Sequence, residues 1–513
     1  LSLHDALPIS EGIDEAADAP LTYLQHEMGG EAADIRLQTF LRYGPEMVEF
    51  FHQRTAVQFL SGSAMPDFHP SPGAANGGRS VTAHPYDGRL LGDWLHRLRP
   101  PLETISLGGM GIAGGADMAH FFNATRSPRS ALYAARRLLR HGWQRLRAGR
   151  GQHLVNGNAL VARLLRSALD AGVRFQLNAP VVRLLQGPPG VSGAVLRSDS
   201  GEIHVEAGAV VLACGGFPHD RQRLAQVVPH AAEGYGHFSA APPDNQGEGI
   251  RLGESVGGQF DTSLRHPLAW APVSRVTLAS GQQLMFPHLV ERAKPGVIAV
   301  LPNGKRFVNE ADSYHDFIAA LLAATPAGDT PQAWLLADRR TLRRYGLGHA
   351  RPFPFTPTAW LRTGYLQRGN TLAELAKQCA IDANALAETV ERFNHFASAG
   401  EDVDFHRGAS AYNRAQGDHQ VTLGPLREGP FYAVRILPGS LGTFSGLQTD
   451  EHARVLDEQQ QPIPGLYAIG NDMSSVMRGY YPSGGITLGP AMTFGYLVGK
   501  NLAKKTNINN NIT

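Results

Sequence analysis

The sequence GLYAIG at residues 465–470 is followed by RGYYPSGGITLGP at residues 478–490, and these two stretches decide the fold. The first is typical of a short strand, and the apolar residues 486–501 after the second predict a helix. The glycine-rich turn therefore opens onto a helix N-terminus, where unpaired backbone N–H groups bind an oxygen or an electron-rich ring edge. Tyr481 stands just before that terminus, and a phenol beside such amides can polarise a carbonyl group. A packed Gly/Pro turn without a chemical role is the simpler interpretation.

An earlier strand also ends in glycines. Residues 209–213 (AVVLA) form a continuous apolar run, which predicts a strand buried on both faces of its sheet. Gly215 and Gly216 follow, and glycine lets the backbone approach a ligand at the carboxyl end of a strand. A helix before Gly172 and alternating strands up to Val205 precede this run. The order of these elements predicts an α/β domain of the nucleotide-binding type.

The character of the chain changes between residues 234 and 408. Short apolar runs, many prolines and a pair of helices near 371–378 and 383–399 predict a mixed α+β domain, with Thr371 as the cap of the first helix. Strand patterns return after Pro430, so the α/β domain is predicted to be split by this insertion. The expected division is 1–20 as a foreign or disordered start, 21–233 as the first part of the α/β domain, 234–408 as the inserted domain, 409–503 as the completion of the α/β domain and 504–513 as a disordered tail.

Length and composition agree with a two-domain globular protein. The chain has 513 residues, of which 42% are apolar and 18% are charged, and its formal net charge is +2. Most of the basic excess falls in one segment, residues 136–150. A solvated helix face explains this segment better than nucleic-acid binding does, because no aromatic residues are interleaved in a nucleic-acid motif.

Only two cysteines occur, Cys214 and Cys379, and they are far apart in the sequence. The sequence therefore predicts no disulfide framework, no structural zinc site and no attached haem. Cys214 is expected to be a small buried residue. The histidines form no metal-binding pattern, so no metal is expected. No apolar run approaches the roughly 20 residues of a membrane span. The sequence predicts a cytoplasmic protein without a membrane span or a nucleic-acid partner.

Residues 109–114 (GMGIAG) match G-x-G-x-x-G, the dinucleotide-binding fingerprint. The preceding residues 104–107 make a poor strand, and no acidic residue stands about 20 positions later to bind a ribose. A loop beside a site is the better interpretation.

Several segments together resemble the flavoprotein family that contains 3-ketosteroid dehydrogenases and soluble fumarate reductases. The resemblance implies FAD lying across the split α/β domain, with the inserted domain closing over the flavin ring. The segments that carry it are LVNGNALVARLL (154–165), VVLACGGF (210–217), NGKRFVNEADSY (303–314), GLYAIGNDM (465–473) and YYPSGGITLGPAMTFG (480–495). The residues implied to bind FAD are Val181, Ala213, Gly215, Gly216, Gly470, Asn471, Asp472, Gly485, Ile486 and Thr487.

One part of the family pattern is missing. Members of the family have a strand and a G-x-G-x-x-G turn before the region that matches Leu21, and this chain has neither. The expectation is an N-terminally truncated FAD domain, and a non-catalytic fragment that cannot hold FAD is an alternative.

The resemblance also implies a substrate class. In fumarate reductase-like members an arginine stands four residues after the position of Glu310, whereas this chain has Tyr314, as ketosteroid dehydrogenases do. A tyrosine suits a large neutral ketone in an apolar cleft, whereas arginine suits a carboxylate. A reductase of an unsaturated carboxylate stays an alternative, because Arg265 and His266 stand where fumarate reductases bind their substrate.

The implied mechanism uses two tyrosines. Tyr481 and the Gly485 amide polarise a ketone, Tyr314 as phenolate removes a proton from the next carbon, and a hydride leaves for flavin N5. Ser483 replaces a glycine, so the position of the bond that is oxidised stays open. A phenol has a pKa near 10, so a neighbour must lower it; the candidates are His315, Arg306 and the flavin. A third phenol found in some members is replaced by Phe68, and the resemblance does not specify the electron acceptor.

Overall fold

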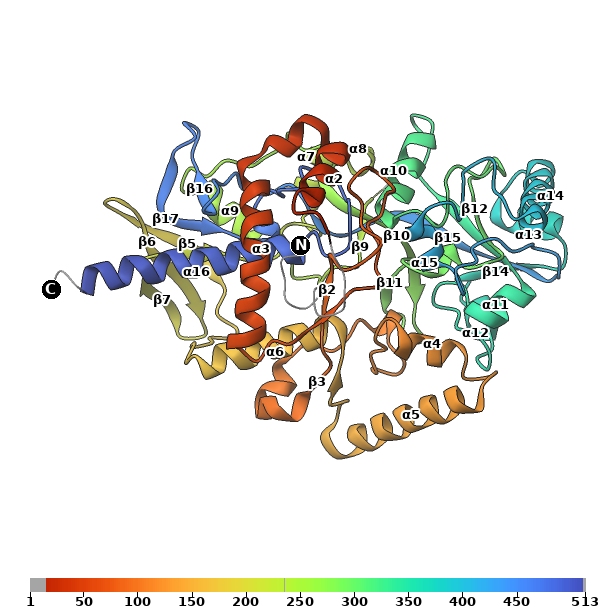
Figure 1. Cartoon of the computed structure of the whole chain (residues 1–513), viewed down its shortest axis with the longest axis horizontal. Helices are drawn as coiled ribbons and strands as arrows, with labels where there is room; N and C mark the ends of the chain where they lie inside the picture. Colours follow the sequence, from red (N-terminus) through yellow and green to blue (C-terminus); the bar gives the residue numbers. More distant parts are fainter. Residues whose placement is uncertain (1–14, 235, 511–513) are drawn as a thin grey trace.

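The structure is a computed structural model that describes residues 15–234 and 236–510. Figure 1 shows an elongated molecule with different sheets at its two ends. One end carries small sheets and the long helix α16 (Leu488–Asn510), and the other carries a seven-stranded sheet covered by helices. A split α/β half joined to a second sheet domain agrees with the predicted fold class.

The α/β half contains a three-stranded sheet in the order β16-β17-β8, formed by β8 (Val210–Leu212), β16 (Arg454–Leu456) and β17 (Pro462–Ala468). The strands β8 and β17 are parallel, with Leu466 opposite Val210, so the chain returns to this sheet after the insertion. Leu212 is buried, but Val211 is 38% exposed. The prediction of a strand buried on both faces is therefore wrong, because within the described residues β8 is an edge strand.

A separate antiparallel sheet follows the order β5-β6-β7, formed by β5 (Val181–Gly187), β6 (Gly190–Ser198) and β7 (Gly201–Glu206). The helix before it, α6 (Asn156–Asp170), ends where Gly172 adopts φ +75°. Residues 173–177, expected to be a strand, are irregular. They pair with no strand in the described part of the chain, and Val173, Phe175 and Leu177 are exposed.

Two N-terminal helices lie against the α/β half, α2 (Ala19–Met28) and α3 (Ile35–Arg54). The first of them, α2, begins two residues before the boundary expected at 21. Residues 1–14 of the expected foreign start lie outside the described residues. At the other terminus α16 runs to Asn510, so residues 504–510 are helical and the predicted disordered tail is wrong there. No glycine or proline in this segment interrupts the helix, and residues 511–513 lie outside the described part of the chain.

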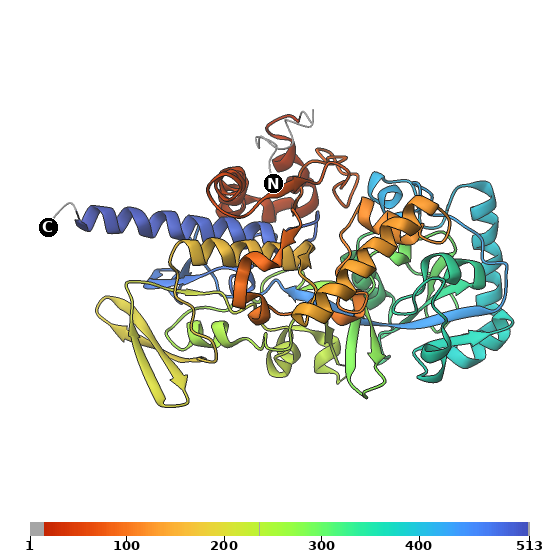
Figure 2. The ribbon, with the colours of Figure 1, turned by 90° about the horizontal axis from the view of Figure 1, so that it is seen from below.

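The segment between these helices and α6 carries short elements and one long helix, α5 (Pro128–Ala148), which caps at Ser127. Figure 2 shows α5 lying across the face of the molecule seen from below. The other elements of this segment are β1 (Phe59–Ser61), β2 (Val81–Ala83), β3 (Tyr86–Asp87), η2 (Gly88–Arg97), η3 (Glu103–Ile105), α4 (Ala116–Phe122) and β4 (His153–Leu154), whereas η1 (Gly29–Ala33) lies between α2 and α3.

The second half is built on a seven-stranded sheet in the order β11-β10-β15-β13-β12, with β14 and β9 also paired to β15. Its strands are β9 (Phe238–Ser239), β10 (Leu268–Thr277), β11 (Gln283–Pro287), β12 (Val297–Val300), β13 (Ala333–Asp338), β14 (Leu366–Gly369) and β15 (Phe431–Thr443). The central strand β15 lies beyond the boundary expected at 408. It nevertheless belongs to this sheet, because it pairs with β10 and β13. We propose that the inserted unit extends to Thr443.

Helices cover this sheet. The predicted pair is present as α13 (Leu372–Cys379) and α14 (Ala383–Ala399), and the Thr371 side chain accepts a hydrogen bond from the Glu374 amide at 3.1 Å, as the predicted cap requires. The following helical elements complete the chain between residues 221 and 472, whether or not they contact this sheet: α7 (Arg221–Val227), α8 (Pro229–Ala232), α9 (Glu248–Glu254), η4 (Glu291–Ala293), α10 (Tyr314–Ala324), α11 (Arg339–Tyr345), α12 (Thr358–Arg362), α15 (Ala411–Gln416) and η5 (Gly470–Asp472).

Candidate active site

Two tyrosines from distant parts of the chain meet between the halves. The Tyr314 hydroxyl donates a hydrogen bond to the Tyr481 hydroxyl at 2.6 Å, and the rings are 5.1 Å apart in an edge arrangement. Tyr314 is the first residue of α10 in the second half, and Tyr481 precedes α16 in the α/β half. The structure therefore brings together the two residues that the sequence assigned to proton transfer and ketone binding.

The start of α10 fixes the position of Tyr314. Ser313 caps the helix, and its hydroxyl accepts a hydrogen bond from the Asp316 amide at 3.1 Å. The following apolar residues Phe317 and Ile318 are fully buried against the seven-stranded sheet. A capped helix held by its apolar face gives the tyrosine at its first turn a fixed direction.

Aromatic rings surround the tyrosine pair. Phe68 stacks on Tyr481 with ring centres 5.6 Å apart, meets Tyr314 edge-on at 5.8 Å and lies 4.5 Å from the ring of Tyr412. Phe444 lies 5.8 Å from Tyr481 on another side. Phe68 stands where some members of the family have a third phenol. Tyr412 brings a further buried phenol next to Phe68, and sequence reasoning missed it.

This apolar setting controls ionisation. Burial and the neighbouring Tyr481 raise the pKa of Tyr314 well above its usual 10. Burial also raises the pKa of Tyr481 to about 12, although the hydrogen bond from Tyr314 opposes this rise. Both phenols are therefore neutral at pH 7. The Tyr481 oxygen accepts from Tyr314, which leaves its own proton available for a ligand oxygen.

The expected sources of positive charge do not serve Tyr314. Burial lowers the pKa of His315 to about 3, so this ring is neutral, and its Nδ1 accepts the Trp270 amide at 3.2 Å. Arg306 is held by Glu310 at 2.7 Å and by Asp402 at 2.8 Å. Neither residue offers a free cation to the phenol.

Arg292 is the cation that acts on Tyr314. Its guanidinium is buried and donates to the backbone oxygens of His288 (2.7 Å), Glu310 (2.8 Å) and Asp312 (3.2 Å). Within the described residues it has no carboxylate within salt-bridge distance, so its charge is not neutralised by a direct partner. This charge opposes the rise in the pKa of Tyr314. Sequence reasoning missed this residue, because Arg292 stands in a polar turn that is far from both tyrosines in the sequence.

The turn before α16 is open on one side. Gly485 has φ +87°, and a Cβ added there would meet no atom within 4 Å. Among the described residues, the backbone amides of Gly485, Ile486 and Thr487 have no hydrogen-bond acceptor. These free donors at a helix N-terminus suit an anionic or electron-rich ligand, as predicted for this turn.

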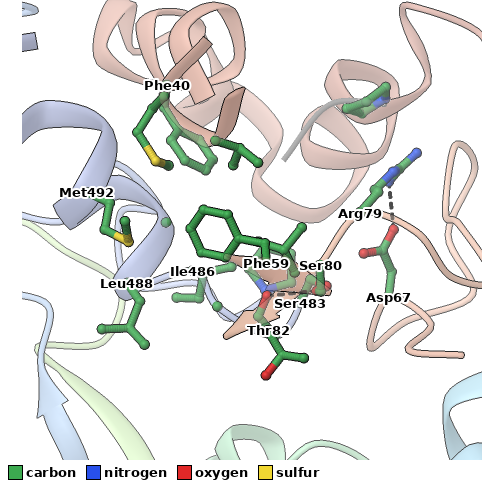
Figure 3. A pocket seen from close by; sticks show the side chains of 18 of the residues that line it. Phe40, Phe59, Asp67, Arg79, Ser80, Thr82, Ser483, Ile486, Leu488 and Met492 are labelled. Atoms are coloured by element: carbon green, nitrogen blue, oxygen red, sulfur yellow. Dashed lines mark hydrogen bonds and ion pairs between the residues drawn. The ribbon is translucent and has the colours of Figure 1, made fainter. Parts of the chain in front are cut away.

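A cavity of about 230 Å³ lies against this turn. Figure 3 shows Phe40, Ile486, Leu488 and Met492 on its apolar side, with Ser80, Thr82 and Ser483 nearby. Gly485 and Ile486, both implied to bind FAD, line it. An apolar cavity next to free backbone amides fits a flavin ring, whose edge carries hydrogen-bonding atoms.

The glycines after β8 are tied to the start of the C-terminal segment. The Asp472 carboxylate accepts hydrogen bonds from the amides of Cys214 (2.5 Å) and Gly216 (2.9 Å). Gly470, Asn471, Ile486 and Thr487 surround a second cavity of about 20 Å³. Most residues implied to bind FAD thus gather around β8, η5 and the turn before α16.

Other predicted residues lie elsewhere. Val181 opens β5 and is exposed, and Ala213 is also exposed; neither lines the two cavities. Cys214 is exposed, so the expectation that it is buried is wrong, because β8 ends at the surface there. Arg79 is buried in ion pairs with Asp67 and Glu15.

Three further expectations have structural outcomes. Arg265 lies over the Tyr480 ring at 5.0 Å, and the His266 ring is 5.0 Å from His315. Residues 109–114 form a loop that borders a large cavity, as the loop interpretation predicted. In the described part of the chain, no group of histidine, cysteine and acidic side chains could hold a metal ion, and no helix is both long and apolar enough to cross a bilayer.

Comparisons with known proteins place this geometry in a family. The FAD binding domain family matches residues 3–488. The chain is 39% identical over 472 residues to 4-oxocyclohex-2-ene-1-carboxylate 5-dehydrogenase of Sinomonas cyclohexanicum, covering 91% of this chain and 80% of that protein. It is 33% identical over 512 residues to 3-oxosteroid 1-dehydrogenase of Mycolicibacterium smegmatis, covering 96% and 87%.

A solved structure agrees with these relatives. The 3-ketosteroid delta1-dehydrogenase of Sterolibacterium denitrificans, in complex with 1,4-androstadiene-3,17-dione, has a TM-score of 0.88 and 34% identity, covering 98% of this chain and 91% of that chain. The relation to fumarate reductases is more distant. The chain belongs to the FAD binding domain family, which confirms the predicted resemblance and the FAD cofactor.

Proposed function

We propose that this member of the FAD binding domain family is a dehydrogenase that removes two hydrogens from adjacent carbons beside the ketone of a cyclic, steroid-like substrate. The hydrogen-bonded pair of Tyr314 and Tyr481, with the open Gly485 amide four residues after Tyr481 in the sequence, is the observation that carries this proposal. It supplies a proton acceptor and two hydrogen-bond donors in an apolar setting. The relatives act on cyclic ketones, which supports this substrate class.

The protein's own residues account for half of the reaction. Tyr481 and the Gly485 amide donate hydrogen bonds to the ketone oxygen, which acidifies the neighbouring C–H bond. Tyr314, in its ionised form, accepts that proton. FAD, when bound, would supply the hydride acceptor for the next carbon, so that loss of one proton and one hydride would leave a double bond in the substrate. The aromatic rings of Phe68 and Phe444 exclude water from the pair.

The residues around the pair favour a ketone over a carboxylate as the reacting group. No arginine contacts either tyrosine hydroxyl in the described residues, and the rings that touch the pair include Phe68 and Phe444. A carboxylate bound there would lack the charge-assisted contacts that repay its desolvation. The reductase of an unsaturated carboxylate therefore has less support at this position.

The replacement of Tyr314 by Phe tests the proposal. We expect kcat with a 3-ketosteroid and a dye acceptor to fall by about 10²-fold or more, because general-base catalysis is lost, while steroid binding persists. Tyr86→Phe is the matched control, since the Tyr86 hydroxyl is buried without a hydrogen-bond partner. Turnover of Tyr314→Phe close to that of Tyr86→Phe would reject Tyr314 as the base.

We also propose a cytoplasmic location. The absence of a disulfide between Cys214 and Cys379 supports a reducing compartment. Cell fractionation of the native host tests this part, and recovery of the protein outside the cytoplasm would overturn it.

A further inference from the structure

The helix α5 carries an exposed apolar stripe. Leu132, Leu139, Trp143 and Leu146 are 73%, 75%, 57% and 86% exposed. Their spacing of seven, four and three residues places all four side chains on one face of the helix. At 21 residues α5 is about 31 Å long, and Figure 2 shows it on the surface of the molecule. Large apolar side chains in one such row mark an interaction surface.

A row of arginines runs beside this stripe. Arg129, Arg136, Arg140 and Arg147 are exposed, and none of them forms a salt bridge with a described residue. The Arg147 guanidinium lies over the Trp143 ring at 4.3 Å. The sequence has no aspartate or glutamate between Asp117 and Asp170, so the charged side chains of α5 itself are all positive.

The opposite side of α5 is anchored to the protein. Arg137 pairs with Asp117 at 2.6 Å, and the Gln144 side chain accepts the Gln152 amide at 2.9 Å. His141 and Arg145 both donate to the Gly108 carbonyl oxygen at 3.0 Å. The helix is thus fixed on its inner side, and the stripe and the arginine row face outward.

We propose that α5 docks on the surface of a bilayer containing anionic phospholipid, with its axis in the membrane plane. An apolar face with tryptophan and leucine, flanked by arginines, matches helices that lie at the boundary between headgroups and acyl chains. Lipid phosphates supply ion-pair partners for these four arginines, which form no salt bridge with a described residue. A second copy of this chain fits less well, because two such helices would face each other without any acidic side chain to pair the arginines.

This surface borders a large cavity. A cavity of about 710 Å³ lies beneath the C-terminal part of α5, lined by His141, Arg145 and the loop of residues 100–112. It meets the cofactor-side cavity at Asn156 and Gly157, which line both. Docking through α5 would bring the mouth of this cavity close to the bilayer.

Co-sedimentation of the full chain with vesicles tests the proposal. We expect binding to phosphatidylcholine vesicles containing 25% phosphatidylglycerol at low salt, and weak binding to phosphatidylcholine alone or in 0.5 M NaCl. Arg136→Gln with Arg140→Gln should weaken binding about 30-fold, since each arginine near an anionic surface contributes about 1 kcal/mol. Leu139→Ser with Leu146→Ser should weaken it about tenfold or more.

Matched controls replace equally exposed residues elsewhere: Arg339→Gln with Arg340→Gln at the start of α11, and Leu90→Ser, which is 60% exposed. These should bind as the parent does, and all variants should keep its melting temperature. A blue shift of tryptophan emission on adding vesicles should vanish in Trp143→Phe. Failure to bind anionic vesicles at low salt would overturn the proposal. A second result would also overturn it. If sedimentation velocity showed a dimer, and the leucine substitutions in α5 dissociated that dimer, the exposed surface would bind a second copy of the chain.

Discussion

Tyr314 is neutral at pH 7, because burial and the adjacent Tyr481 raise its pKa well above 10. If it is the base, only its ionised fraction is active, and that fraction rises tenfold per pH unit below the pKa. We therefore expect log kcat to rise with a slope of about one between pH 7 and about 9. A pH–rate profile at saturating ketone measures this. A profile that is flat or falls in this range would contradict a tyrosine base.

Arg292 should set the pH range over which kcat rises, which is the alkaline limb of the pH–rate profile. Its charge favours the phenolate, so Arg292→Met should move the limb to higher pH and lower kcat at pH 7.5. Arg292→Lys keeps the charge and should keep the limb near its parent position. A purely structural role would lower activity equally at every pH, because it would leave the Tyr314 pKa unchanged. The comparison of the two profiles decides between these roles.

Sequence comparison identified correctly which residues meet wherever those residues belong to family motifs. It paired Tyr314 with Tyr481, and the structure brings their hydroxyls to 2.6 Å. It could not find Arg292, because a buried guanidinium bound only to backbone oxygens has the same sequence context as a solvated one. It also proposed that His315 or Arg306 lowers the pKa of Tyr314, because both are near it in the sequence. Burial keeps the His315 ring neutral, and Arg306 forms an ion pair with Glu310.

At the element scale, His69 connects α2 with α10. Its Nδ1 lies 2.5 Å from Glu27 and its Nε2 lies 2.7 Å from Asp316. Burial favours the neutral ring, but the hydrogen bonds to Asp316 and Glu27 raise the pKa of His69 to about 10. The charged ring thus holds the helix that bears Tyr314, and its neighbour Phe68 packs on both tyrosines.

The replacement of His69 by Gln should lower the free energy of unfolding by about 2 kcal/mol at pH 6. The folded-state pKa is raised above the unfolded value near 6.5, so this contribution is fully present below pH 6.5 and is lost as pH rises through about 10. Urea denaturation of parent and variant at several pH values measures the difference. His96→Gln, at an exposed histidine without a partner, is the control. A difference that grows with pH would contradict the charged link.

Helices were easier to predict than strand partners. The helices α13 and α14 were predicted because Thr371 and the apolar spacing are local signals. The strand β15 was predicted, but its place in the seven-stranded sheet was not, because an apolar run does not identify its neighbours. Residues 504–510 were expected to be disordered from composition alone, yet they continue α16.

At the scale of the whole molecule, the cofactor site joins segments that are remote in sequence. Asp472 near the C-terminus holds the amides of Cys214 and Gly216, and the turn at Gly485 faces the cavity that Phe40 helps to line. A ligand that contacts several of these segments stabilises the folded chain in proportion to its binding. Binding of FAD should therefore be visible as global stabilisation.

We expect the melting temperature to rise by about 2–3 °C when FAD is present at 100 times its dissociation constant, a gain of about 2.7 kcal/mol. FMN is the matched ligand: it carries the same ring without the adenosine, so it should stabilise less at equal concentration if residues near Gly215 and Gly216 bind the adenosine half. Replacing Asp472 by Asn should reduce the FAD shift, because the carboxylate positions the Cys214 and Gly216 amides. No shift with FAD, together with a colourless protein, would instead favour a chain that folds without holding its cofactor, and would separate loss of FAD binding from a failure of Tyr314 in catalysis.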